Sequence, residues 1–319
     1  MENTAEKLQI IFGDATLGVK GEDFRYIFSY ATGGLESLHV GGKEWLYRTP
    51  KPTFWRAVTD NDRGNGFPLR SGMWLSADLF IHTVKRQVSI DGKQIPLPIA
   101  PENNQYGQDC FAREAAVTFV YETITVPSTI VTVVYRVDAR GRIQCDVHYQ
   151  GRPGLPELPV FGMRFVMPTA AERYRYQGLS GETYPDRREG GREGIYEVQG
   201  LPVTPYLVPQ ECGMHVETEW LEVFRRTELD NRSKEWKETG LRFAMTDRTF
   251  SFSCLPYTAE ELENATHQEE LPPARRTVLC ILGAVRGVGG IDSWGADVEP
   301  AYRISGETDI RYSFTIEKC

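Results

Sequence analysis

Hydrophobic and polar residues alternate along most of the chain, which is the pattern of strands buried on one face. The segment Arg142–Tyr149 shows the alternation most clearly, because every second residue from Ile143 to Tyr149 is apolar or aromatic. Similar segments, and shorter apolar runs bounded by turn residues, predict about fifteen strands in all. The principal segments are Leu8–Phe12, Phe24–Tyr30, Ala116–Val126, Ile130–Val137, Val160–Met167, Gly213–Phe224, Leu241–Phe252, Thr277–Val285 and Arg311–Glu317.

Two short glycine turns predict β-hairpins. Gly41-Gly42 separates Leu35–Val40 from Lys43–Tyr47, and Gly92 separates Val88–Asp91 from Lys93–Leu97. Glycine adopts the positive φ that a two-residue hairpin turn requires, so each pair of segments is expected to form adjacent antiparallel strands.

Helical signals are few. Thr258 and Glu261 have the spacing of a capping box, which predicts a helix from there to about Thr266, ending before Pro272. A weaker pattern at Ser71–Phe80 predicts a second short helix.

No segment has the composition of a linker between domains. The stretches rich in Pro and Gly, 151–159 and 200–209, are short and mixed with apolar residues, and the charged stretch 225–238 is expected to be a solvated loop or hairpin tip. The segment Pro205–Gly213 is expected to be extended at a sheet edge. The sequence therefore predicts an all-β fold, one large antiparallel sandwich over residues 1–319 with one or two short helices.

Composition narrows the functional class. The 319 residues include 44 acidic and 36 basic side chains, for a formal net charge of −8, which argues against a nucleic acid partner. No apolar run approaches the roughly 18 residues that a membrane-spanning helix needs. The polar start, Met1–Lys7, has no apolar signal core, so a cytoplasmic protein is expected. Six scattered cysteines, none in a C-x-x-C pair, predict neither a zinc site nor a dithiol.

A glycine-rich loop near the end of the chain carries a single large aromatic residue. Gly287–Gly295 follows the apolar run Thr277–Val285 and presents Trp294 after Asp292 and Ser293. A tryptophan on such a loop can offer a flat apolar face to a sugar ring or a partner. The alternative, on local sequence alone, is that Trp294 folds back under its own loop.

The densest polar constellation is Phe54–Gly64, with Asp60-Asn61-Asp62 at its centre. The two aspartates resemble the start of a calcium loop, but Asn65 stands where that loop needs glycine, and Ser71 where it needs a bidentate Glu. The sequence favours an Asx-turn network at Asp60–Asp62, with Arg56 paired to one of the aspartates.

Candidate catalytic groups are weak. Ser180 lacks the G-x-S-x-G context and a matching His/Asp pair. Glu182 and Asp186 are a possible carboxylate pair for glycoside hydrolysis, but their spacing alone does not support that chemistry. The five histidines show no metal-binding spacing. No catalytic set and no metal site is predicted on this chain.

Four motifs in order nevertheless identify a family. They are Phe54-Trp55-Arg56-Ala57 with Asp60-Asn61-Asp62, Gly181-Glu182-x-Tyr184-Pro185-Asp186-Arg187, Thr204-Pro205-Tyr206 with Val208-Pro209-Gln210-Glu211, and Gly289-Gly290-x-Asp292-Ser293-Trp294. Together they resemble the C-terminal domain of bacterial family 2 β-galactosidases. Because the chain starts at its own Met1 and holds only this domain, it is expected to be similar to the small subunits of two-chain enzymes, whose large subunit is a separate polypeptide.

This resemblance implies a galactose mutarotase-like supersandwich that completes the active site of a large catalytic subunit, which would carry both catalytic glutamates and any Mg²⁺ or Na⁺. No cofactor is expected on this chain, since Ala265 stands where single-chain members have a threonine near a sodium ion. Trp294 would stack on the sugar of a β-galactoside such as lactose, and Gly289, Gly290, Asp292 and Ser293 would support its loop. The isolated chain is expected to be inactive and to self-associate.

Two other functions on the same fold remain open. A stand-alone aldose 1-epimerase would need a His and a Glu facing one sugar, and no such pair is visible in the sequence. A carbohydrate-binding module without an enzyme partner is the other.

Overall fold

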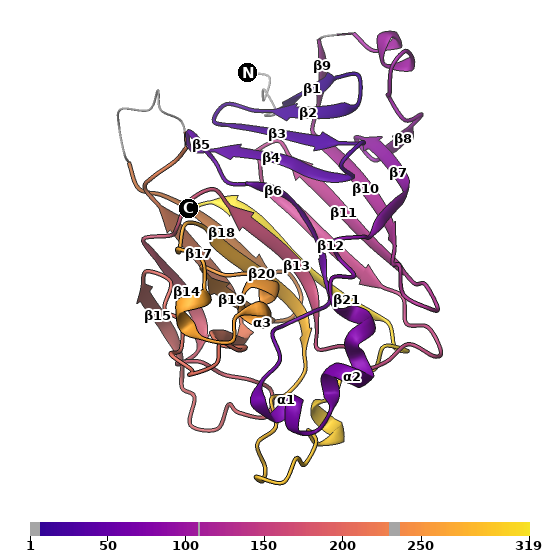
Figure 1. Cartoon of the computed structure of the whole chain (residues 1–319). Coiled ribbons are helices and arrows are strands. Elements are labelled where there is room, and N and C mark those ends of the chain that lie inside the picture. The colour runs from indigo at the N-terminus through magenta and orange to yellow at the C-terminus, as the bar shows by residue number, and fades with distance from the viewer. Residues whose placement is uncertain (1–6, 108, 230–236) are drawn as a thin grey trace.

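The computed structural model describes residues 7–107, 109–229 and 237–319, which form three antiparallel sheets (Figure 1). The largest has ten strands in the order β15-β14-β17-β18-β21-β12-β11-β10-β7-β8. Its strands are β7 (His82–Ile90), β8 (Lys93–Ile95), β10 (Glu114–Glu122), β11 (Ile130–Asp138), β12 (Ile143–Tyr149), β14 (Arg173–Leu179), β15 (Glu193–Gln199), β17 (Trp220–Arg225), β18 (Thr239–Met245) and β21 (Ile310–Lys318).

Two smaller sheets complete the fold. The six-stranded sheet, β5-β4-β3-β2-β1-β9, contains β1 (Leu8–Phe12), β2 (Thr16–Lys20), β3 (Phe24–Ser29), β4 (Gly34–Val40), β5 (Lys43–Glu44) and β9 (Cys110–Ala112). The five-stranded sheet, β16-β19-β20-β13-β6, contains β6 (Arg48–Thr53), β13 (Val160–Met167), β16 (Met214–Thr218), β19 (Phe250–Leu255) and β20 (Thr277–Val285).

Both smaller sheets pack on the large one through aromatic side chains. Phe165 of β13 contacts Phe243 and Phe314 of the ten-stranded sheet, with ring centroids 5.3 and 6.2 Å apart. Phe28 of β3 contacts Tyr135 of β11 at 5.6 Å. The alternation in β12 places Ile143, Cys145, Val147 and Tyr149 in this buried layer. The all-β antiparallel prediction is therefore confirmed, because the alternating apolar faces bury one another.

The predicted hairpins are confirmed, and their turns have the expected backbone. Gly41 and Gly42 have φ of 61° and 78°, and Asp91 and Gly92 have φ of 48° and 76°. Strand β6 was missed because Pro50 and Pro52 argue against a strand; the sheet accommodates them by placing β6 at its edge.

Two predicted long strands are wrong, since each is divided between two sheets. The segment 213–224 forms β16 in the five-stranded sheet and β17 in the ten-stranded sheet, with Glu217 at a φ of 55°. The segment 241–252 likewise divides into β18 and β19 around a polar turn at Thr246–Thr249. Alternation of apolar and polar residues shows which face of a strand is exposed, but not which sheet the strand joins. The points where the chain passes from one sheet to the other could therefore not be predicted from it.

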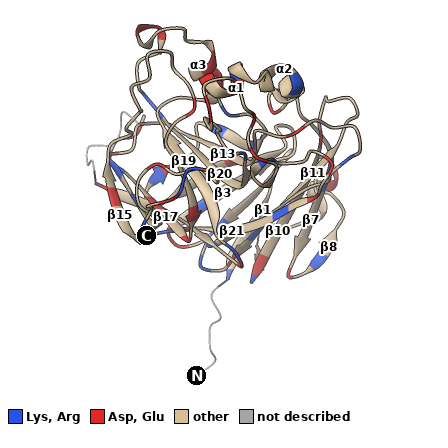
Figure 2. Cartoon of the chain, turned by 90° about the horizontal axis from the view of Figure 1, so that it is seen from below, with Lys and Arg blue, Asp and Glu red and all other residues tan. Residues whose placement is uncertain are grey.

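The described residues form three short α-helices, which lie on the same side of the molecule (Figures 1 and 2). The capping box of Thr258 and Glu261 is confirmed at the start of α3 (Ala259–Asn264). The helix predicted at Ser71–Phe80 is wrong in position: α2 spans Phe67–Ser71, followed by the 3₁₀ turn η1 (Gly72–Trp74). Pro68 is the second residue of α2, in the first turn, where its missing N–H is tolerated.

The segment Asp60–Asp62 is helical rather than an Asx-turn network. It begins α1 (Asp60–Gly64), with a capping box in which Thr59 is the N-cap and Asp62 returns the hydrogen bond. The predicted extended segment Pro205–Gly213 contains no strand. The charged stretch 225–238 lies partly outside the described residues, which stop at 229 and resume at 237. None of the described helices is long and apolar enough to span a membrane.

Candidate functional site

The loop that follows β20 holds the most exposed tryptophan side chain of the described residues. Trp294 is 91% exposed, whereas Trp45 and Trp74 are fully buried. The loop runs from Arg286 to Glu299 and ends at the 3₁₀ turn η4 (Pro300–Tyr302). The alternative in which Trp294 folds under its own loop is therefore wrong for this chain.

Backbone hydrogen bonds shape the tip of this loop. The Asp292 carboxylate accepts from the amides of Trp294 and Ala296 at 2.9 and 3.1 Å. These amide donors hold the pKa of Asp292 below its ordinary value. Ser293 is exposed, and its hydroxyl makes no hydrogen bond to the residues that the structure describes. Asp292 therefore fixes the turn that presents Trp294.

Glycine is required where the loop approaches its neighbours. Gly290 has a φ of 80°, and a Cβ there would lie 2.8 Å from Asn61 Nδ2. A Cβ at Gly287 would lie 2.6 Å from the Asp186 carboxyl carbon. Gly289 also has a positive φ, of 69°. Side chains at these positions would push the loop away from the segments that hold it.

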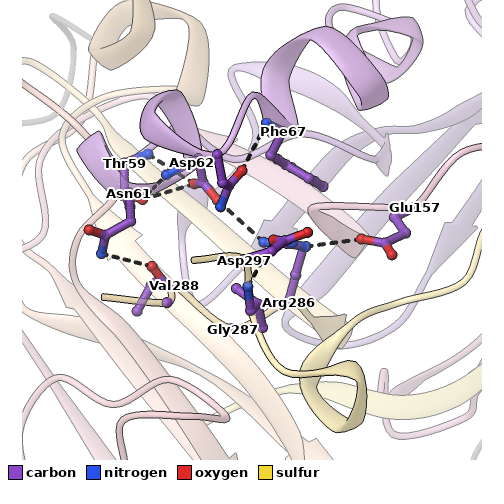
Figure 3. Close-up of polar contacts among 12 residues, drawn as sticks. Thr59, Asn61, Asp62, Phe67, Glu157, Arg286, Gly287, Val288 and Asp297 are labelled. Carbon is purple, nitrogen blue, oxygen red and sulfur yellow. Dashed lines mark hydrogen bonds and ion pairs between the residues drawn. The ribbon is translucent and has the colours of Figure 1, made fainter. Parts of the chain in front are cut away.

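Asp186 and Asn61 bind the backbone at the start of the loop. The Asp186 carboxylate accepts from the amides of Val288 and Gly289 at 3.0 and 2.8 Å. Asn61 Nδ2 donates to the Val288 carbonyl at 3.0 Å (Figure 3), and Arg187 donates to the Gly289 carbonyl. Glu182 instead accepts from Thr204 Oγ1 at 2.8 Å. Asp186 and Glu182, considered above as a hydrolytic pair, therefore bind different segments: Asp186 binds the loop, and Glu182 binds Thr204.

A buried ion-pair network lies beneath the loop (Figure 3). Arg286 contacts Asp62 at 3.3 Å, Asp297 at 2.6 Å and Glu157 at 3.4 Å. Arg56 pairs with Asp62 at 2.7 Å, as the sequence predicts for one of the two aspartates, and also donates to the Gly287 carbonyl at 3.1 Å. Burial alone would raise the pKa of Asp62, but Arg56 and the Thr59 hydrogen bonds hold it below its ordinary value.

The third motif packs against the first. Gln210 accepts from the Asp60 amide at 2.9 Å. Glu211 is buried beside Arg56, and burial, which Arg56 only partly offsets, raises its pKa to about 8. All four sequence motifs are therefore joined at one end of the molecule, around the base of the Trp294 loop. Within the described ranges, no three His, Cys, Asp or Glu side chains group as a metal site would require.

Some of this framework was missed from the sequence. Arg286, Asp297 and Glu157 belong to none of the four motifs, although a charged residue directly after a buried strand was a usable signal for Arg286. His215, a packing residue by its strand pattern, is stacked on Phe252 with ring centroids 4.6 Å apart, and burial lowers its pKa to about 4. At 5% exposure, the His215 side chain cannot face a sugar.

Comparison with known proteins identifies the family. The family model described as "Beta galactosidase small chain" matches residues 20–316. The chain belongs to the β-galactosidase small-chain family. Within the curated relatives, this member is 64% identical over 316 residues to the β-galactosidase small subunit of Latilactobacillus sakei, covering 99% of each chain.

Other relatives of the β-galactosidase small-chain family are much longer. The chain is 33% identical over 312 residues to the β-galactosidase of Streptococcus thermophilus, covering 97% of this chain but only 28% of that one. Among solved structures, a galactose mutarotase-like protein from Lactobacillus casei matches with a TM-score of 0.43 and 11% sequence identity. The match covers 95% of this chain and 100% of that protein.

Proposed function

We propose that the chain is the non-catalytic subunit of a two-chain β-galactosidase, and that it presents Trp294 to a sugar bound by a large catalytic subunit. The assembled enzyme would hydrolyse terminal β-galactosides such as lactose with retention of configuration, using two glutamates of the large subunit. The observation that carries the proposal is a tryptophan 91% exposed at the tip of a loop with a fixed base, in a member of this family.

The tryptophan contributes by contact rather than by proton transfer. Its indole face suits the apolar face of a hexose or the position of the leaving group. A loop held at Asp186, Asn61 and Asp292 keeps the ring in place before substrate arrives, so little conformational entropy is lost on binding. The ring would also exclude water from one side of the sugar.

An apolar surface beside this loop is the proposed contact with the large subunit. It consists of Leu69, Met73, Leu79, Phe80 and Val126, with exposures of 91, 40, 58, 59 and 78%. Met73 and Val126 touch, since the Val126 amide approaches Met73 Sδ at 3.4 Å. The surface borders the loop, because Arg70 of α2 pairs with Asp297 at 2.8 Å. In the Streptococcus thermophilus relative, the remainder of the polypeptide would be available to cover it.

The same surface would make the isolated chain self-associate, because exposed contiguous leucine and phenylalanine side chains favour burial. Any Mg²⁺ or Na⁺ of the enzyme is assigned to the large subunit, and no cofactor to this chain. A cytoplasmic location is in keeping with six free cysteines, since reducing compartments keep thiols unpaired.

The decisive experiment is reconstitution. The purified chain should show no hydrolysis of a chromogenic β-galactoside, and activity should appear when a large β-galactosidase chain is added. Robust hydrolysis by the chain alone, abolished by Glu182→Gln, would refute the proposal and return the reaction to the local carboxylates.

The apolar surface can be tested on the same complex. The double substitution Leu69→Glu with Phe80→Glu should abolish co-elution with the large chain in size-exclusion chromatography, because two charges would be desolvated in the interface. Ile195→Glu on the exposed face of β15, where the side chain is 61% exposed, is the matched control and should leave assembly intact. Equal loss for both variants would contradict the assignment of this surface.

A further inference from the structure

A cavity lies on the outer face of the five-stranded sheet, away from the Trp294 loop. It has a volume of about 460 Å³, and its walls come from β6, β13, β20, the start of α3, the segment 272–276 and the pair Asp78-Leu79. Val278, which lines this cavity, is near the start of β20. Arg286, in the ion-pair network below the loop, follows the end of the same strand, eight residues later. At roughly 3.4 Å per residue, these two residues are about 27 Å apart along the strand.

Arg164 forms the floor of this cavity. Its guanidinium is 10% exposed and pairs with Glu260 at 2.7 Å and with Asp78. The other carboxylate oxygens, Asp78 Oδ1 and Glu260 Oε1, are buried without a hydrogen-bond partner among the described residues. A buried acceptor without a donor is unfavourable by about 1–3 kcal/mol. Two buried acceptors beside the cavity therefore lack donors, which a hydroxyl group would supply.

The mouth of the cavity is cationic. Arg48, Arg275 and Arg276 line it, and none pairs with a carboxylate in the part of the chain that the structure describes. Arg276 lies over the Tyr47 ring at 3.6 Å, which holds its guanidinium in position. Five cationic side chains and three carboxylates line the whole cavity, an excess of positive charge in a chain of net charge −8. Such a local reversal of sign attracts anions.

We propose that this cavity binds a small polyhydroxylated anion, a sugar phosphate or a sugar acid. The arginines at the mouth would bind its anionic group through charge-assisted hydrogen bonds, and Asp78 and Glu260 would accept hydrogen bonds from its hydroxyl groups. The volume falls within the range of about 300–1,000 Å³ that is usual for small-molecule sites. The inference uses no residue of the Trp294 loop, although Leu79 at the cavity wall also belongs to the proposed contact with the large subunit.

Calorimetric titration of the purified chain tests the ligand class. The probes are glucose 6-phosphate, gluconate, inorganic phosphate and galactose. We expect saturable binding with one site per chain for glucose 6-phosphate or gluconate, and the stronger of the two identifies phosphate or carboxylate as the preferred group. Inorganic phosphate should bind at least tenfold more weakly and galactose not measurably, because each lacks one of the two recognised features. Absence of saturable binding for both polyhydroxylated anions would overturn the proposal.

Variants locate the binding. Arg275→Gln should weaken binding of the polyhydroxylated anion about tenfold, whereas Arg113→Gln, which removes an exposed charge between β9 and β10, should leave it unchanged. Glu260→Gln should weaken that binding but not the binding of inorganic phosphate. Equal effects of Arg275→Gln and Arg113→Gln would mean general attraction to charge and would overturn the site. If Arg275→Gln weakened assembly with the large chain while no small anion bound, the cavity would be a protein contact instead.

Discussion

Two arginines, Arg286 directly after β20 and Arg164 within β13, differ in how their carboxylate partners are satisfied. Arg286 is fully buried, contacts three carboxylates and packs on the Phe67 ring at 4.0 Å. Both oxygens of its partner Asp62 accept hydrogen bonds, from the two arginines and from Thr59. Arg164 has two carboxylate partners, and each keeps one buried oxygen unbonded.

The difference separates a framework from a binding site. A network in which every buried acceptor has a donor stabilises one geometry, and this geometry positions the Trp294 loop. A cluster that leaves acceptors unbonded is tolerated only where water or a ligand can supply donors. The predictions below test this contrast, beginning with the largest expected effect.

Removal of Asp62, the carboxylate shared by Arg56 and Arg286, should reduce stability most. Asp62→Ala leaves Arg56 and Arg286 buried without their shared partner, so the free energy of unfolding should fall by about 3–5 kcal/mol and the Tm by roughly 5 °C. Calorimetry of the isolated chain measures both quantities. The matched control is Asp60→Ala in the same helix, whose side chain is 71% exposed and pairs with Arg63. A loss from Asp60→Ala as large as from Asp62→Ala would show that helix formation, and not the network, is being measured.

Glu211 lies between the two clusters, where a cavity of only about 30 Å³ is lined by Arg56, Glu211 and Arg164. Its pKa of about 8, against an ordinary 4.5, means that the folded state holds a proton that the unfolded state releases between those pH values. Stability contributed by this group should therefore be present below pH 4.5 and be lost as the pH rises to 8, by about 3 kcal/mol at pH 7.

Replacement of this carboxyl by an amide should remove that pH dependence. Glu211→Gln should be more stable than the natural chain at pH 8, and the advantage should shrink towards pH 5. Urea unfolding at pH 5, 6, 7 and 8 measures the change, with Glu22→Gln, at an exposed position after β2, as control. An advantage that grew on acidification would contradict the raised pKa.

The loop above the closed network should affect catalysis rather than stability. Trp294→Ala in the reconstituted enzyme should lower kcat/KM for galactosides ten- to hundredfold, or about 1–3 kcal/mol, because a stacking face is lost. The Tm of the free chain should stay unchanged, since the ring is 91% exposed. Trp294→Phe should restore part of the activity, and Gly290→Val should mimic Trp294→Ala by displacing the ring. Unchanged kinetics with a lowered Tm would assign Trp294 to packing.

The cluster of Arg164, Asp78 and Glu260 should lose the least stability when one partner is removed. Glu260→Gln leaves Asp78 paired with Arg164, so Arg164 loses only one of its two carboxylate partners. The Glu260 side chain is also 20% exposed, so water partly compensates for the loss. The free energy of unfolding should change by about 1 kcal/mol or less. A loss comparable to that of Asp62→Ala would mean that both arginines depend equally on their anions, and the contrast between the clusters would fail.

Local periodicity predicted much of this fold, because alternation and capping depend on neighbours in the chain. The capping box at Thr258 and the glycine turns at Gly41 and Gly92 are local signals of this kind. The crossings after β16 and β18 depend on which distant strand pairs with which, and no local pattern contains that information.

The site was predictable in part for the same reason. Resemblance to a family pointed to Trp294 and its glycines, and a pairing of Arg56 with an aspartate follows from adjacent residues. The contacts of Arg286 with Glu157 and of Asp186 with Val288 join segments more than a hundred residues apart. The cavity at Arg164 is assembled from segments far apart in the chain and carries no motif.

The contact between Arg286 and Asp297 has a consequence for how this loop can change in evolution. These residues stand where the loop leaves and rejoins the body of the protein, and their ion pair at 2.6 Å ties its two feet together. The ten residues between them form a loop whose two ends are held together by this ion pair. Each doubling of a loop's length adds only about 0.6 kcal/mol of closure entropy. Insertions or deletions at the tip should therefore leave the sandwich intact while they alter how far the aromatic ring extends, so substrate preference can diverge without refolding the subunit.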